Sequence, residues 1–214
     1  MFNFDLIKIL LTIPGILIAF SFNGFMRALV ADKLGDSTPR NMGKLSLSPK
    51  AHIDILGLIL IVLIGFGWPK PVITNPNNFK NPKRDDTLVS LAGPFVNLIV
   101  AVLFIFFIKL VFIFNIYNYL GNSISLNLIM ICFYTANINI ILFLFSLLPV
   151  PPLQGFSIVR NWIPIKYNEI INSIEKYGFV ILILLMVSGV LGKIIGKPTA
   201  IIINSIVTLF NVPI

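Results

Sequence analysis

Six apolar runs limit what this chain can fold into more than any other feature of its sequence. A helix that crosses a lipid bilayer needs roughly 20 consecutive apolar residues, so three of the runs are long enough and three are short. The long runs are 6–31, 88–114 and 126–148, and the short ones are 53–67, 178–190 and 198–212. Hydrophobic residues make up 57% of the 214 residues, and charged residues only 11%. The sequence therefore predicts an α-helical integral membrane protein.

The connections between these runs differ in charge, and the whole chain has a net charge of +8. The connection 115–126 has no charged residue, whereas three other connections are basic, with Lys33, Arg40, Lys44 and Lys50, then Lys70, Lys80, Lys83 and Arg84, then Arg160, Lys166 and Lys176. The positive-inside rule predicts that the basic connections lie in the cytoplasm and the uncharged one outside. This pattern is typical of a multi-pass protein of the cell membrane that contacts the lipid bilayer, and it does not indicate a nucleic-acid partner.

The run 53–67 has basic flanks on both sides, which would place both of its ends on the same side of the membrane. It is short, contains Gly57, Gly65 and Gly67, and is followed at once by "GWPKPV". We interpret it as a re-entrant hairpin, with a short true span as the alternative. The flanking stretches "KLSLSP" and "PKPVIT" alternate apolar and polar residues, which predicts a short β element at the membrane surface.

Five landmarks in a fixed order carry a resemblance to a known family: "GDSTPR", "LSLSPKAHID", "GFGWPKPVITNPNNFKNPKR", "LAGPFVNL" and "NINIILFLFSLLPVPPLQG". Over residues 16–160 the chain resembles the site-2 protease family of intramembrane zinc metalloproteases, in its small bacterial form. The resemblance implies a site-2-protease-like helix core over residues 1–160. Residues 161–214 are expected to add an interfacial helix that begins at Lys166, followed by further membrane segments.

The family's zinc site falls on residues of a different kind in this chain. In the family, two histidines and a glutamate form H-E-x-x-H, and an aspartate after the "LLPxPP" turn is the third ligand. The resemblance aligns the histidines with Asn23 and Arg27, the glutamate with Gly24 and the aspartate with Gln154. The family's asparagine before "LLP" aligns with Ser146. The resemblance therefore implies no catalytic residue, and no zinc cofactor where the active members hold one.

The chemistry of these residues leads to the same expectation. Carboxamide oxygens are poor zinc ligands, Arg27 has a permanent positive charge, and Gly24 offers no general base. Two interpretations of Arg27 stay open: it hydrogen-bonds inward with Gln154 or a carboxylate, or it snorkels to the membrane surface. The single histidine, His52, is interpreted as stabilising a turn, with a ligand or base as the alternative.

Two proline-containing stretches flank the expected cleft. "LAGPFVN" is interpreted as a kink and close-packing element, and "PVPPLQG" as a rigid, extended segment that presents Gln154. The candidates for lining the cleft are Asn23, Arg27, Asn97, Asn139, Ser146 and Gln154.

We expect a catalytically inactive homologue, a pseudoprotease, that binds a membrane-protein or peptide segment without cleaving it. The partner would be an active protease or the substrate of one. One alternative is an active intramembrane metalloprotease with unorthodox ligands, and another is a structural membrane subunit.

Overall fold

A computed structural model describes residues 6–64, 67–116, 119 and 121–213. This part of the chain is helical and contains no strand, and it includes five helices that are long and apolar enough to cross a membrane. These helices are α1 (Leu6–Lys33), α5 (Pro82–Ile113), α7 (Asn122–Ser146), α9 (Asn168–Val187) and α10 (Val190–Leu209). Shorter helices lie between them: α2 (Thr38–Asn41), α3 (Pro49–His52), α4 (Ile55–Ile64), η1 (Pro76–Asn78), α8 (Gln154–Trp162) and η2 (Ile165–Tyr167).

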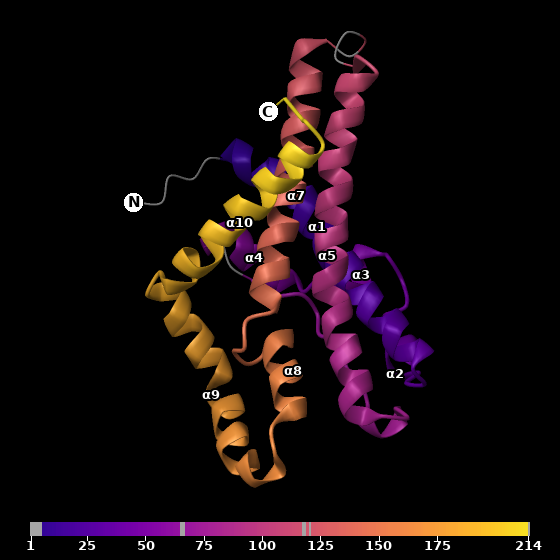
Figure 1. Cartoon of the computed structure of the whole chain (residues 1–214), viewed down its shortest axis with the longest axis vertical. Helices are drawn as coiled ribbons and strands as arrows, with labels where there is room; N and C mark the ends of the chain where they lie inside the picture. Colours follow the sequence, from indigo (N-terminus) through magenta and orange to yellow (C-terminus); the bar gives the residue numbers. More distant parts are fainter. Residues whose placement is uncertain (1–5, 65–66, 117–118, 120, 214) are drawn as a thin grey trace.

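Helices α1, α5 and α7 pack against one another and form the centre of the molecule (Figure 1). Ile105 and Ile108 of α5 pack with Ile140 of α7, and all three side chains are fully buried. Small residues let the helices approach closely, as they commonly do in membranes. A Cβ added to Gly15 of α1 would lie 2.8 Å from the Thr135 Cα of α7. "LAGPFVN" brings α5 to α1 in the same way, because Gly93 leaves room for the side chain of Asn23.

Helices α9 and α10 are longer than the apolar runs 178–190 and 198–212 that predicted them. The helix expected to begin at Lys166 does form, but from Asn168, and it continues through the apolar residues to Val187 as one element. Residues 168–187 contain no proline, and their one glycine, Gly178, lies against Pro151. Helix formation is cooperative, so a polar first half does not end the helix. The turn to α10 comes at Gly189, whose φ of +71° suits glycine.

The segment expected to be a re-entrant hairpin leaves and returns at the same place. Helix α4 has 10 residues, which is about 15 Å at 1.5 Å per residue and roughly half of a bilayer core. Afterwards the chain comes back: the Lys70 N–H donates to the His52 carbonyl at 2.7 Å. Gly57 lies against the backbone of Trp68, and Gly65 is outside the described residues. The two ends of the segment therefore lie together, and the placement of α4 as a re-entrant hairpin in a membrane stays a prediction.

The predicted β element is not confirmed. Neither of the two predicted stretches forms a strand. Among the described residues near them, the β pairing is a single bridge between Ile53 and Pro69. Pro69 and Pro71 have no N–H to donate, so a ladder cannot extend from that bridge.

Two ends of the molecule can be recognised in Figure 1. The C-terminal end of α1, helix α2, the start of α5 and the connection from α8 to α9 lie toward the lower end of the view. The connection from α5 to α7 lies at the upper end; its residues 117–118 and 120 are outside the described part. Parts of the three basic connections thus lie at one end of the molecule. That this end faces the cytoplasm stays a prediction.

Candidate functional site

A cavity of about 430 Å³ gathers most of the residues that the sequence proposed for a cleft. Its walls come from α1, α5, the end of α7, the start of α8, α9 and the segment that follows α4. Five of the six candidates line it, namely Asn23, Arg27, Asn97, Ser146 and Gln154. The sixth, Asn139, does not: it is fully buried, and its Nδ2 donates to the Thr135 carbonyl of its own helix at 2.8 Å.

The local structure explains how the candidates reach the cavity. Asn23 and Arg27 are four residues apart in α1, which puts them on one face. Ser146 ends α7 and Gln154 begins α8. The prolines between them do not run extended as predicted, because the chain turns with bonds from Val150 N–H to Leu148 O (2.8 Å) and from Leu153 N–H to Val150 O (2.9 Å). Gly155 then lies against the Leu147 carbonyl, so α8 starts directly beside the end of α7.

The guanidinium of Arg27 faces the cavity and is not bonded to the protein. Its Nε is buried without a partner, and none of its nitrogens hydrogen-bonds to any residue that the structure describes. The bond to Gln154 that the inward interpretation of Arg27 expected is therefore not formed. Within the same described residues no acid pairs with Arg27 within 4.0 Å. The acid whose charge acts on Arg27 is Asp86, whose Oδ2 accepts a bond from Asn161 Nδ2 at 2.8 Å.

Asn97 of α5 is the most deeply buried polar side chain in the cavity wall. It is 1% exposed, and neither its Nδ2 nor its Oδ1 has a partner among the described residues. Buried amide groups are almost always hydrogen-bonded, because an unpaired one costs free energy. Asn97 therefore lies in the cavity wall with an unpaired donor group, Nδ2, and an unpaired acceptor, Oδ1. Ser146 and Asn23 are also buried, at 6% and 7% exposure.

His52 occupies the space beside Gly24. Its ring is fully buried, and Nε2 must be the donor in a 2.6 Å bond to the Ser46 carbonyl, because a carbonyl only accepts. This bond spans the turn between residues 46 and 52, as the turn-stabilising interpretation expects. Burial lowers the pKa of His52, the bond to Ser46 partly raises it and nearby Lys44 lowers it further. The ring is therefore neutral, with an unpaired Nδ1 that a Cβ on Gly24 would overlap.

Sequence reasoning did not anticipate this contact between His52 and Gly24. The two residues are 28 positions apart, and neither residue type indicates a partner. The signal that existed was the glycine itself, because a glycine in the middle of a helix is often there for a close approach.

The side chains around the cavity do not suit a zinc ion. The described lining offers carboxamides, a hydroxyl and a guanidinium, and it contains no imidazole, thiolate or carboxylate. The part of the chain that the structure describes also has no group of three or more His, Cys, Asp or Glu that could hold a metal. Zinc sites in proteins are built from those ligands, and the positive charge of Arg27 would repel the ion. What the lining can do is bind an anion or donate and accept hydrogen bonds.

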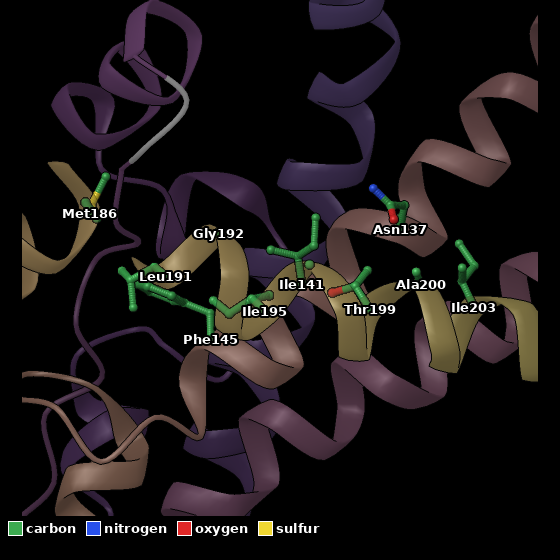
Figure 2. Close-up of a pocket in the computed structure, with 11 residues that line it drawn as sticks. Asn137, Ile141, Phe145, Met186, Leu191, Gly192, Ile195, Thr199, Ala200 and Ile203 are labelled. Carbon is green, nitrogen blue, oxygen red and sulfur yellow. The ribbon is translucent and has the colours of Figure 1, made fainter. Parts of the chain in front are cut away.

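A second, larger cavity of about 520 Å³ lies between α7 and α10 (Figure 2). Figure 2 shows Ile141, Phe145, Leu191 and Ile195 along it, with Asn137 and Thr199 among its few polar residues. The described residues around this space have no charged side chain. It therefore offers no group for acid–base chemistry or ion binding, and the polar cavity is the candidate site.

Comparisons with known proteins identify relatives. The chain is 35% identical over 175 residues to "Putative zinc metalloprotease YwhC" of Bacillus subtilis, which covers 81% of this chain and 78% of the relative. It is 24% identical over 189 residues to "Putative zinc metalloprotease Rip2" of Mycolicibacterium smegmatis (86% and 69% covered), and 27% identical over 186 residues to the Rip2 of Mycobacterium tuberculosis strain H37Rv (85% and 68%). No protein-family profile and no solved structure matches. Because the similarity to YwhC extends over most of both chains, this protein belongs to the site-2 protease family of zinc metalloproteases.

Proposed function

We propose that this chain is a catalytically inactive member of the site-2 protease family that binds a segment of a membrane protein in the polar cavity without cleaving it. One observation carries the proposal. Asn23, Arg27 and Gln154, which the resemblance aligns with the family's zinc ligands, meet in one cavity, and none of them is a metal ligand of the usual kind.

Peptide hydrolysis by a zinc protease needs a metal to polarise the carbonyl and a base to activate water. The lining of this cavity supports neither role. The position aligned with the glutamate is Gly24, and the neutral ring of His52 fills the space beside it. The Nδ1 of His52 points at Gly24, and His52 is not among the residues that line the cavity.

A segment of polypeptide is the occupant that suits the cavity. Its amides can pair with peptide groups, and its apolar wall includes Phe20, Leu142 and Leu182. The partner is proposed to be an active protease of the membrane or a substrate of one. The protein is proposed to act in the cell membrane, with α4 as a re-entrant hairpin. The C-terminal part, residues 161–214, contributes through Phe179 and Leu182 of α9.

Metal content tests the first half of this proposal. The purified full chain in detergent is equilibrated with excess zinc, freed of unbound ion and measured by mass spectrometry; we expect far less than one zinc per chain. The comparison is a triple variant, Asn23→His, Arg27→His and Gln154→Asp, which supplies three ligands and leaves Gly24 in place because a side chain there would overlap His52. We expect the triple variant to bind zinc and any one of the substitutions alone to bind none, because the ligands act as a set.

Cleavage tests the second half. The wild-type protein is incubated with a labelled transmembrane peptide in lipid nanodiscs, with zinc or with a chelator. We expect the peptide to stay intact in both cases and to co-purify with the protein. Stoichiometric zinc in the wild type, together with cleavage that the chelator blocks, would show an active protease and refute the proposal.

A further inference from the structure

We propose that the polar cavity recognises a carboxylate at the end of a peptide chain, with Arg27 as its counter-ion and Asn97 pairing with the last peptide group. This inference rests on the proposed function, because it takes the occupant to be polypeptide. It adds which part of the polypeptide is bound and by which side chains.

The charge of Arg27 favours an anion in the cavity. A guanidinium stays protonated at every relevant pH, and a charge in an apolar environment is costly unless an opposite charge accompanies it. Among the residues that the structure describes, Arg27 has no hydrogen-bond acceptor and no ion pair within 4.0 Å. Asp86 acts on it from farther away, and Asp86 is itself bonded to Asn161. A carboxylate in the cavity would match the planar fork of the guanidinium.

The start of α8 also favours an anion in the cavity. This nine-residue helix begins at Gln154, and its N-cap residue, Leu153, has no side chain that can cap it. The Phe156 N–H donates to the Leu153 carbonyl at 3.1 Å, which leaves the N–H groups of Gln154 and Gly155 uncapped within the described residues. Leu153 and Gln154 both line the cavity. Uncapped N–H groups at a helix start carry partial positive charge and commonly bind anions. The helix start and Arg27 therefore favour an anion in the same space.

Asn97 favours a peptide over a fatty acid or a simple phosphate ester. Its Nδ2 needs an acceptor, and its Oδ1 needs a donor. A fatty-acid carboxylate or a phosphate ester offers acceptors only, and would leave Oδ1 unpaired. A peptide group offers both a carbonyl and an N–H, so it can satisfy both atoms of one buried amide.

The rest of the wall indicates what precedes the carboxylate. Trp68 and Phe179 meet edge to face, with ring centroids 5.6 Å apart, and Phe20 and Leu182 also line the cavity. Aromatic and aliphatic surfaces favour apolar side chains. The expected ligand is thus a short apolar sequence that ends in a free carboxylate.

Binding of matched peptides tests the inference on the full chain in detergent, by fluorescence anisotropy. The probe is a hexapeptide of Leu, Val and Phe with a fluorophore at its N-terminus and a free C-terminal carboxylate. The comparisons are the same peptide as its C-terminal amide, the amide with Glu as its last residue, and a fluorescent fatty acid. We expect the free acid to bind about tenfold more tightly than the amide, as one charge-assisted pair can provide.

Substitutions test whether the preference for the free-acid peptide over the amide comes from the cavity. Arg27→Gln should make the affinities for the free-acid peptide and the amide peptide nearly equal. Arg27→Lys should keep part of the preference for the free acid, because it keeps the positive charge. Asn97→Leu should weaken the acid and the amide alike. The control is Arg160→Gln, which removes an exposed guanidinium paired with Glu175 outside the cavity and should leave the preference unchanged. If an Arg27 variant does not fold, the wild-type comparison of acid with amide still decides the matter.

Each contrary result overturns a defined part of the inference. Equal affinity of acid and amide for the wild type would overturn it and leave the proposed function intact. Equal binding of the Glu-containing amide would overturn the assignment to a chain end, and tight binding of the fatty acid would overturn the assignment to a peptide. Failure of all peptides to bind would refute the inference together with the proposed function.

Discussion

The ring of His52 lies so close to Gly24 that it leaves no space for a side chain at position 24. The fully buried imidazole is held by its bond to the Ser46 carbonyl, and its Nδ1 faces the Cα of Gly24. Two residues of the cavity wall have unmet needs within the described residues: Arg27 has no hydrogen bond and no ion pair within 4.0 Å, and the amide of Asn97 has no hydrogen-bond partner. The proposed preference of this cavity for an anion and a peptide group over a metal ion therefore depends on single side chains.

Gly24→Ala is expected to destabilise the protein by about 1–3 kcal/mol, the usual cost of adding a carbon to a filled site. The added Cβ would overlap the His52 ring, which cannot move without losing its bond to Ser46. Thermal unfolding in detergent measures the effect. Gly196→Ala in α10 is the matched control, because no atom lies within 4 Å of its added Cβ; it should be neutral or raise the melting temperature. A melting temperature unchanged by Gly24→Ala would mean that the packing is looser than described.

Asp36 joins two elements that are far apart in the sequence. It follows α1 and is fully buried, and its carboxylate accepts bonds from the N–H of Thr38 (3.1 Å), the hydroxyl of Thr38 (2.6 Å), the N–H of Asn75 (2.7 Å) and Nδ2 of Asn78 (2.7 Å). These bonds connect the start of α2 to η1, which leads into α5. Burial raises the pKa of Asp36, but the bonds from Thr38, Asn78 and Asn75 outweigh it, so the pKa is lower than usual.

The stability that Asp36 contributes should depend on pH. Because its pKa is lower in the folded than in the unfolded protein, the contribution is complete above the ordinary aspartate pKa and is lost as the pH falls through the folded value, below about pH 4. Asp36→Asn should be less stable than the wild type at pH 7, and the difference should shrink toward pH 3, as measured by unfolding at each pH. Glu175→Gln, in an exposed ion pair with Arg160, is the control and should change little. If the stability difference between Asp36→Asn and the wild type did not change with pH, the loss of stability would come from packing and not from the charge of Asp36.

The charge distribution and the two ends of the molecule together define a topology. The uncharged connection between α5 and α7 lies opposite the end that holds α2 and the turn from α8 to α9 (Figure 1). The closed path from His52 to Lys70 lets α4 leave and return on one side. With α4 as a hairpin, α5 and α7 are enough to connect the three predicted cytoplasmic segments on the same side.

Cysteine labelling of intact cells tests this topology. A cysteine at Ser123 should react with a membrane-impermeant maleimide from outside, and cysteines at Asn77 and Lys166 should react only after permeabilisation. All three positions are exposed. Asn77 is preferred to Asn78, whose side chain holds Asp36. The single native cysteine, Cys132, is buried and provides the unlabelled background. External labelling at Asn77 would mean that α4 spans the membrane.

The sequence by itself determined the membrane class of the protein, its three central helices and five of the residues that line its cavity. A run of about 20 apolar residues can satisfy its backbone in a bilayer only as a helix, so α1, α5 and α7 follow from local composition. Asn23, Arg27, Asn97, Ser146 and Gln154 could be named because polar side chains stand out in apolar segments, and because the resemblance to a family connected them.

Only the tertiary structure decided how those residues meet. The lengths of α9 and α10, the turn at Pro151, the absence of partners for Arg27 among the described residues, and the contact of His52 with Gly24 depend on segments that lie apart in the chain. Asn139 shows the same limit, since its pattern matched the other candidates and yet it is buried away from the cavity. The periodicity of a helix indicates which residues share a face, but which neighbour covers that face is decided by packing between helices.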